Sequence, residues 1–305
     1  MPSKCEPVII SASRRTDIPA FYSEWFINRV QSGFFVKVNP YNHRQQKQIS
    51  LLQDDVAAFV FWTKNPFPLM PSLPLLETLG HRYLFHFTLN NYPKVWEPRI
   101  PPLNERMTTF RRLSEQIGPE KVIWRYDPII VSDVDPASYH LEQFSRIANS
   151  LRGYTQRVMI SLVTLYDKVL LNMKRSDLAQ SIRLKDLRAP ECQQELCVFM
   201  KGLASIAKMN DLRIYSCSEK ADLTAYNIQP GSCIDSQLLN QLFDLDLKPA
   251  KDKYQRPECH CAPSIDMGFY DTCRFGCLYC YANTNMERVT KNFSLHNPTS
   301  PTLLV

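Results

Sequence analysis

The sequence predicts an α/β protein: a complete or partial (β/α) barrel of the TIM type that carries a cysteine-rich segment near its C-terminus. Short apolar runs rich in β-branched and aromatic residues alternate with segments of helical periodicity along most of the chain. These runs are apolar on both faces, which is typical of parallel strands buried on both sides. The number of repeated strand-then-helix units favours a barrel.

Each element is predicted from its own pattern. A helix is expected from Asn104 as N-cap to Gly118, with an apolar stripe on one face, and a second one from Asp135 as N-cap and Pro136 at the first position to Gly153. The stripes of these two helices are Met107, Phe110, Leu113 and Ile117 in the first, and Leu141, Phe144, Ile147 and Leu151 in the second. The predicted strands are Val8–Ser11, Phe34–Val38, Ala57–Trp62, Tyr83–Thr88, Val122–Arg125, Val158–Leu162 and Leu212–Tyr215.

Length and composition fit one large unit. A chain of 305 residues with 44% hydrophobic residues can bury a full core. We expect residues 1–254 to form the barrel, residues 255–284 a cluster-binding segment packed on it, and residues 285–305, which show little periodicity, a tail. The chain lacks the G-x-G-x-x-G and P-loop motifs, which argues against a nucleotide site of either kind.

Charge and targeting signals indicate the possible partners and the cellular location of the protein. A net charge of +6 permits a nucleic acid or another polyanion as partner without requiring one. The first residues lack the apolar core of a signal peptide, and no apolar run reaches the length of a membrane span. We therefore expect a cytoplasmic protein without membrane contact, in which cysteines are ligands or buried thiols rather than disulfides.

Polar residues follow several predicted strands, at the end where barrel enzymes place their functional groups. Arg14, Arg15 and Asp17 follow the first strand, and Arg125 and Asp127 follow the fifth. Their apolar flanks draw the arginines toward the interior, where a guanidinium needs an anionic partner. A binding site for polar ligand groups is one interpretation, and structural Arg–Asp pairs are the other.

The most informative pattern is the spacing C-x3-C-x2-C formed by Cys273, Cys277 and Cys280. Thiolates are the usual ligands of iron–sulfur clusters, and three of them leave one iron of a [4Fe–4S] cluster without a protein ligand. The alternative is a structural zinc site in which Cys277 and Cys280 join Cys259 and either Cys261 or His260.

A second group of cysteines precedes this motif. Cys217 ends the last predicted strand, Cys233 follows a Pro-Gly-Ser turn, and Cys259 and Cys261 form a C-x-C pair. One hypothesis is a second iron–sulfur cluster held by these four thiolates, and the alternatives are buried thiols or a zinc site.

The motif resembles the signature of the radical S-adenosylmethionine (SAM) enzymes, C-x3-C-aromatic-C, with Tyr279 as the aromatic residue. The resemblance implies that SAM chelates the open iron and is cleaved by an electron from the cluster to a 5′-deoxyadenosyl radical, which removes a hydrogen atom from the substrate. It also implies that Tyr279 lies beside the adenine, that the five polar residues above bind SAM or substrate, and that a flavodoxin or ferredoxin supplies the electron. In that superfamily the signature usually follows the first barrel strand, so the order of parts is permuted here.

A wider resemblance covers residues 8 to 283. The segments Ile10–Pro19, Trp62–Pro66, Arg125–Pro128 and Cys259–Asn283 are similar to those of a bacterial family known as domain of unknown function 1848. This family brings no activity with its name. A weaker resemblance, based on the cysteine signature and the barrel, is to the DNA-repair lyases that split thymine photoproducts by radical SAM chemistry.

The sequence thus predicts a radical SAM enzyme whose substrate, reaction and catalytic residue it does not define. Two other classes fit some of the same features. An iron–sulfur electron carrier would use the cluster without SAM, and a nucleic-acid-binding or repair protein would use a structural metal and the modest positive charge.

Overall fold

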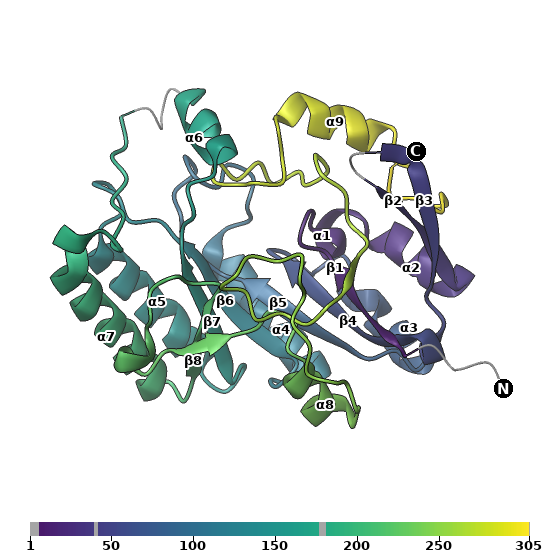
Figure 1. The fold of residues 1–305 in the computed structure, drawn as a ribbon, viewed down its shortest axis with the longest axis horizontal. Helices are drawn as coiled ribbons and strands as arrows, with labels where there is room; N and C mark the ends of the chain where they lie inside the picture. Colours follow the sequence, from purple (N-terminus) through teal and green to yellow (C-terminus); the bar gives the residue numbers. More distant parts are fainter. Residues whose placement is uncertain (1–5, 40–41, 177–180, 305) are drawn as a thin grey trace.

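The centre of the protein is an eight-stranded sheet, seen in the computed structural model shown in Figure 1. The structure describes residues 6–39, 42–176 and 181–304. All neighbouring strands of this sheet run parallel. Their order across the sheet is β10 (Ile265–Asp266), β1 (Val8–Ala12), β4 (Val56–Thr63), β5 (Tyr83–Thr88), β6 (Val122–Ile129), β7 (Arg157–Leu162), β8 (Arg213–Cys217) and β9 (Gln229–Gly231).

The predicted α/β fold with a parallel sheet is therefore confirmed. From β1 to β9 the strands of the sheet follow one another in chain order, so each crossover leads to the next strand in the same direction. The strand pairs found among the described residues leave β9 and β10 at the two edges of the sheet, so the expected closure into a barrel does not follow from them.

One face of the sheet is covered by helices. Alternate strand residues, such as Phe61, Phe85 and Trp124, form a single apolar core with side chains of the surrounding helices. In Figure 1, α5 and α7 lie side by side on this layer, in agreement with their direct contact. The helices are α1 (Ile18–Phe21), α2 (Ser23–Ser32), α3 (Leu73–Thr78), α4 (Leu103–Ile117), α5 (Ala137–Leu151), α6 (Asp167–Lys174), α7 (Gln193–Met209), α8 (Ser236–Phe243) and α9 (Met286–Ser294).

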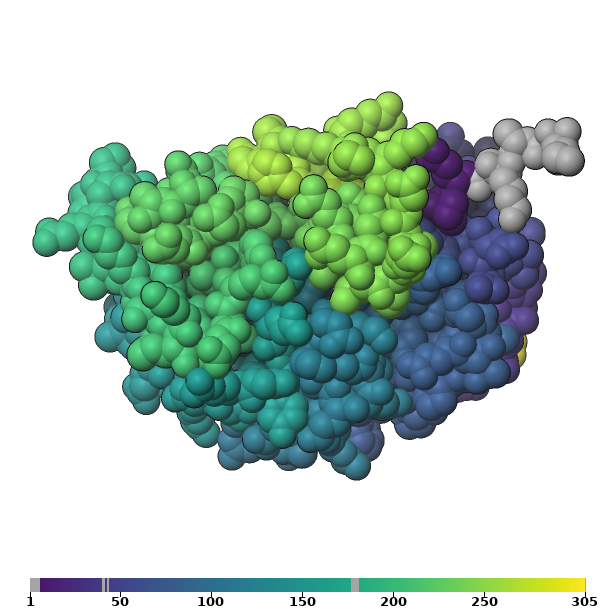
Figure 2. Space-filling view, turned by 90° about the horizontal axis from the view of Figure 1, so that it is seen from below, coloured from purple at the N-terminus to yellow at the C-terminus, as the bar shows by residue number. Residues whose placement is uncertain are grey.

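The opposite face is covered by α8 and the chain around it. Val60, Leu84 and Ile123 point to this side and pack in a second core with Leu238 and Leu239 of α8. The same core contains three cysteines, Cys233, Cys259 and Cys261. Figure 2 looks onto this side of the molecule, with the α8 region in green to yellow-green. The period-2 alternation of the strands thus places one cysteine group against the sheet.

One predicted strand belongs to a different sheet. β2 (Phe34–Asn39) pairs with β3 (Asn42–Ser50) in an antiparallel two-stranded sheet, so the expectation that Phe34–Val38 is a strand of the parallel sheet is wrong. The partner strand consists largely of exposed polar residues, which give no apolar signal in the sequence.

The expectation of a tail after residue 285 is also wrong. Helix α9 begins after its N-cap Asn285, and the residues that follow it lie against α2 and β2. Trp25 Nε1 donates to the carbonyl oxygen of Ser300 at 2.9 Å, and the backbone N–H of Val36 donates to that of Pro301 at 2.8 Å. These contacts to backbone atoms leave no trace in side-chain periodicity.

The two helices predicted in detail are present, with their ends displaced slightly. α4 begins at Leu103, so Asn104 lies inside the helix instead of capping it. α5 begins after Pro136, and the Asp135 carboxylate accepts a hydrogen bond from Trp96 Nε1 at 2.7 Å instead of capping the helix. Leu141 is half-buried, while the other predicted core residues of both helices are buried.

None of the helices in the described ranges is both long and apolar enough to cross a membrane.

A buried histidine should make stability depend on pH. His140 is 0% exposed, and its Nε2 lies 2.8 Å from the carbonyl oxygen of Ile130 while its Nδ1 lies 2.9 Å from the hydroxyl of Tyr126. Burial lowers the pKa of His140 to about 4. The unfolded chain therefore binds more protons below the ordinary histidine pKa, and the free energy of unfolding should fall as the pH drops from about 6.5 toward 4.

For this group alone the loss between pH 7 and pH 5 should be about 2 kcal/mol. Urea unfolding of the wild type and of His140→Gln at both pH values measures it, because the variant lacks the titrating group. Equal pH dependence in the two proteins would contradict this role of His140.

Candidate functional site

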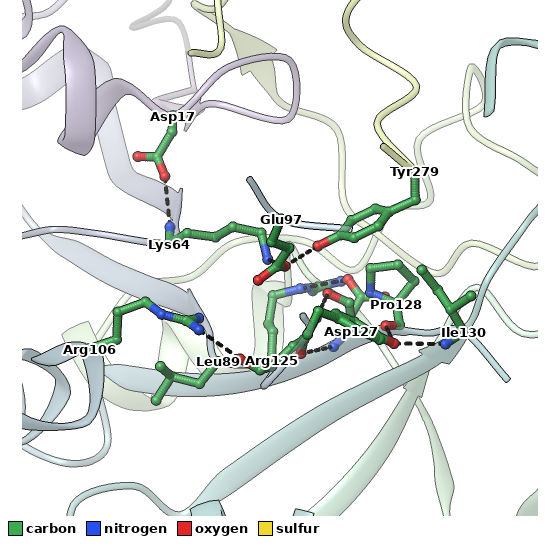
Figure 3. Close-up of polar contacts among 12 residues, drawn as sticks. Asp17, Lys64, Leu89, Glu97, Arg106, Arg125, Asp127, Pro128, Ile130 and Tyr279 are labelled. Atoms are coloured by element: carbon green, nitrogen blue, oxygen red, sulfur yellow. Dashed lines mark hydrogen bonds and ion pairs between the residues drawn. The ribbon is translucent and has the colours of Figure 1, made fainter. Parts of the chain in front are cut away.

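Residues from three strand ends meet the C-terminal cysteine loop at one edge of the sheet. Asp17 follows β1, Lys64 follows β4, and Glu97 lies in the segment after β5. Lys64 Nζ lies 2.7 Å from Glu97 Oε1, and the hydroxyl of Tyr279 donates to the same oxygen (Figure 3). Because the carboxyl ends of parallel strands lie at one edge, side chains distant in sequence converge here.

The cysteine loop lies between β10 and α9. Cys273, Cys277 and Cys280 are free thiols, half-buried, and close enough to one another that their charges interact. The backbone N–H of Ala282 points at Cys280 Sγ from 3.4 Å. Burial raises the pKa of Cys277 to about 12 and also raises the pKa values of Cys273 and Cys280. A bound cation is therefore required to hold all three as thiolates at neutral pH.

Local geometry fixes the course of this loop. Gly276 has a φ of +70°, a conformation that favours glycine, and it turns the chain between the first two cysteines. The N–H of Leu278 donates to the carbonyl oxygen of Trp96 at 2.9 Å, and Asn283 Nδ2 donates to that of Cys273 at 2.7 Å. The loop is thus tied to the segment that carries Glu97.

Glu97 and Arg106 are buried charges with unused hydrogen-bonding capacity. Glu97 is 1% exposed and Arg106 is 4% exposed. Glu97 Oε2 and Arg106 Nη1 have no hydrogen-bond partner among the described residues. Burial opposes the ionisation of Glu97, but Lys64 and Arg106 outweigh it and lower the pKa, so Glu97 is a carboxylate. Buried polar atoms without partners are uncommon, and these two could bond to a ligand group that the protein chain itself does not supply.

Asp17 has a structural part in the site. One oxygen accepts the N–H of Ala20 at 3.0 Å and caps α1, and the other accepts the N–H of Lys64 at 2.7 Å. Burial raises the pKa of Asp17 to about 7. The charge of Asp17 also acts on Cys273, so its carboxyl group lies near the cysteine loop. Figure 3 shows the contact of Asp17 with Lys64.

Arg14 and Arg15 face the C-terminal segment. Arg14 Nη2 donates to Ser264 Oγ at 2.8 Å, and its backbone N–H donates to Asp266 Oδ2 at 3.0 Å. The Arg15 guanidinium lies over the ring of Tyr270, 4.9 Å from the centroid. Both arginines therefore hold the chain that leads from β10 to the cysteine loop.

Arg125 and Asp127 form the structural pair that the sequence offered as one interpretation. Arg125 Nη2 and Nε lie 2.5 Å and 3.1 Å from Asp127 Oδ2. Arg125 Nη1 points at Cys233 Sγ from 2.8 Å. This pair therefore lies beside the second cysteine group, on the face of the sheet that α8 covers, which we call the inner face. Asp127 also accepts a hydrogen bond from Ser161.

Both cysteine groups consist of free thiols. Over the described ranges, no three His, Cys, Asp or Glu side chains are already placed so that one metal ion could contact them all. Three soft thiol ligands at one edge and four on the sheet face nevertheless match the donor sets of iron–sulfur clusters and zinc.

The sequence missed two residues of this site, Glu97 and Arg106. Glu97 lies in a segment rich in proline and aromatic residues without a strand or helix pattern, and Arg106 lies in the first turns of an otherwise ordinary amphipathic helix. Lys64 was visible only as one polar residue after a strand. A charged residue among large apolar neighbours was the one available signal for Glu97.

The fold and the site define an α/β protein with a cysteine-rich loop at the carboxyl edge of a parallel sheet. The model of the family described as domain of unknown function DUF1848 matches residues 9–282. The chain belongs to this family. Curated proteins offer no match to it.

Loss of the Glu97 charge should destabilise the protein. Glu97→Gln keeps the size of the side chain but leaves half-buried Lys64 and buried Arg106 without their anion, which should cost about 3–5 kcal/mol in the free energy of unfolding. Urea unfolding at pH 7 measures it. Glu195→Gln, which alters a surface ion pair with Lys185, is the matched control and should change the midpoint little. An equally small effect of both variants would contradict the proposed charge balance.

Proposed function

We propose that this protein is an iron–sulfur enzyme of the radical SAM type. The observation that carries the proposal is the meeting of the C-x3-C-x2-C loop with buried charged side chains that have unused hydrogen-bonding atoms. An iron–sulfur cluster at these cysteines and SAM bound to it would supply the 5′-deoxyadenosyl radical that abstracts hydrogen from a substrate.

The cysteine loop suits such a cluster. Cys273, Cys277 and Cys280 provide three thiols without disulfides, and the N–H of Ala282 can stabilise charge on Cys280. Lys64 adds a positive charge that acts on Cys277 and Cys280. Three ligands leave one coordination position for a substrate or cofactor.

The polar groups nearby suit the ends of SAM. Glu97 Oε2 can accept a hydrogen bond from an ammonium group, and Arg106 Nη1 can donate one to a carboxylate. Tyr279 donates to Glu97, so we assign it the role of orienting that carboxylate. Asp17 would position Lys64 through its backbone N–H. Arg14 and Arg15 would position the C-terminal segment, and Arg125 and Asp127 would act on the inner face.

The proposal has further parts. The sheet would form part of a barrel whose carboxyl edge excludes water from the reaction. A flavodoxin or ferredoxin would deliver the electron. Free thiols in two groups fit a cytoplasmic location, where reducing conditions keep them available.

Cleavage of SAM tests this function. The protein is reconstituted anaerobically with iron and sulfide and reduced with dithionite, and 5′-deoxyadenosine is measured. Cys277→Ala should lower its formation about 100-fold or more, because loss of a cluster ligand exceeds the effect of a surrounding residue. Cys197→Ala, in α7 and outside both cysteine groups, should keep the wild-type rate.

Binding of SAM, measured by equilibrium dialysis, covers the case in which cleavage waits for a substrate. A reconstituted cluster that neither binds nor cleaves SAM would contradict the proposal and favour an electron carrier. Full activity of Cys277→Ala would contradict the assignment of the cluster ligands.

A further inference from the structure

Four thiols lie together on the inner face of the sheet, away from the carboxyl-edge loop in sequence. Cys217 is the last residue of β8, Cys233 follows β9, and Cys259 and Cys261 lie in the segment that returns across the sheet. Cys217 Sγ and Cys233 Sγ are 2.9 Å apart. The Cys261 thiol interacts with the thiols of Cys233 and Cys259, so the four thiols form a row of neighbours.

This arrangement differs from that of ordinary buried cysteines. A structural thiol packs as a small apolar group, as Cys192 does in the helix-side core. In the row, sulfur faces sulfur, and Cys233 also faces the guanidinium of Arg125 at 2.8 Å. Asp127 accepts hydrogen bonds from Nε and Nη2 of Arg125, and Nη1 of the same guanidinium points at the sulfur of Cys233. The guanidinium is therefore placed to balance the negative charge of a metal-bound thiolate at Cys233.

The backbone fixes the three segments that carry these cysteines. The N–H of Ala262 donates to the carbonyl oxygen of Ile234 at 2.9 Å, which joins the segment of Cys261 to that of Cys233. His86 Nε2 lies 2.7 Å from the carbonyl oxygen of Cys233 and holds that residue against β5. The N–H of Ile234 points at Cys261 Sγ from 3.4 Å, a donor of the kind that surrounds metal-bound thiolates.

A cavity lies beside two of the segments that carry these cysteines. Ser232 and His260, the chain neighbours of Cys233 and Cys261, line a cavity of about 640 Å3. Most of its other lining residues come from β7, β8, β9, α8 and residues 249–251, on the side of the molecule seen in Figure 2. The cavity reaches the chain neighbours of two of the cysteines, so a metal ion that enters it comes within a residue of the group.

We propose that Cys217, Cys233, Cys259 and Cys261 bind a second, thiophilic metal centre with four thiolate ligands, either a zinc ion or an iron–sulfur cluster. Both share this donor set. Zinc binding releases the thiol protons to solvent and changes no oxidation state. A [4Fe–4S] cluster in its oxidised 2+ state contains two ferric and two ferrous ions, so iron supplied as equal parts of the two with sulfide assembles it without a further oxidant, again with release of the thiol protons. Four protein ligands leave no open position, so the centre stabilises the fold or carries electrons and does not bind substrate.

The sulfurs must move apart before they can surround a metal ion. Tetrahedral zinc with Zn–S bonds of about 2.3 Å separates its sulfurs by about 3.8 Å. The Cys217–Cys233 distance of 2.9 Å must therefore grow by about 0.9 Å for zinc, and more for a cluster. Rotation of the side chains supplies this movement, and the four would then surround the ion instead of one another.

Metal analysis of a variant without the first group tests the proposal. The triple variant C273S/C277S/C280S is purified anaerobically, and one portion is reconstituted with iron and sulfide while another is loaded with zinc. Each chain should hold about one zinc, or about four irons with matching sulfide and a brown colour. Adding Cys217→Ser and Cys261→Ser should reduce either content to below about a tenth of that value.

A triple variant that folds, as judged by circular dichroism, and holds neither metal would overturn the proposal. An intact mass lower by two hydrogens in the metal-free protein would assign Cys217 and Cys233 to a disulfide and would overturn it as well. If the triple variant does not fold, wild type is compared with Cys261→Ser, with Cys192→Ser as the control for a buried thiol outside the group. Cys261→Ser should then lose the metal of the second centre alone, while Cys192→Ser keeps the wild-type metal content. Equal metal contents in all three proteins would overturn the proposal.

The inference does not rest on radical chemistry. SAM cleavage depends on Cys273, Cys277 and Cys280, whereas this test is made without them. The two proposals can therefore fail independently, and the two experiments show which one has failed.

Discussion

The position of the cysteine loop depends on Asp266, the last residue of β10. Its carboxylate accepts hydrogen bonds from Ser13 Oγ at 2.8 Å, from the N–H of Arg14 at 3.0 Å and from the N–H of Gly268 at 2.8 Å. These contacts join the end of β10 to the end of β1, although more than 250 residues separate them. The approach is so close that a Cβ on Gly268 would lie 1.9 Å from Ser13 Oγ, so only glycine fits there.

Under the proposed function, this junction would account for the late position of the cysteine motif in the chain. In the superfamily that the motif resembles, the signature follows the first barrel strand. Here β10 lies beside β1 and runs parallel to it, with Ile10 opposite Ile265. The loop after β10 therefore leaves the sheet at the same edge as the loop after β1, next to Asp17 and Lys64. A late segment in the chain can occupy the space that an early loop would otherwise fill, because the edge of a parallel sheet is defined by strand direction and not by order in the sequence.

Much of the fold follows from local patterns, and the failures have physical causes. The apolar strands that were predicted between Ala57 and Leu162 are all members of the sheet, because burial on both faces leaves an unbroken apolar run. β3 was not predicted from the sequence because its exposed polar residues form no such apolar run. The C-terminal residues are held through their carbonyl oxygens by Trp25 and its neighbours, and backbone acceptors are the same in every sequence. In the site, the cysteine spacing indicated a shared location, but Glu97 and Arg106 meet it only through the tertiary fold.

The two cysteine groups differ in a way that their surroundings explain. The first lies at the sheet edge with three thiols, where Lys64, Glu97 and Arg106 keep charged atoms directed at the same space. The second lies against the sheet face among Leu84, Ile123 and Leu238, with Arg125 as the one guanidinium that contacts a sulfur among the described residues. A centre with an open coordination position needs polar groups to orient what binds there, whereas a centre with four ligands needs only burial and charge balance. The number of thiols and the polarity of each environment therefore agree with the separate roles proposed for the two groups.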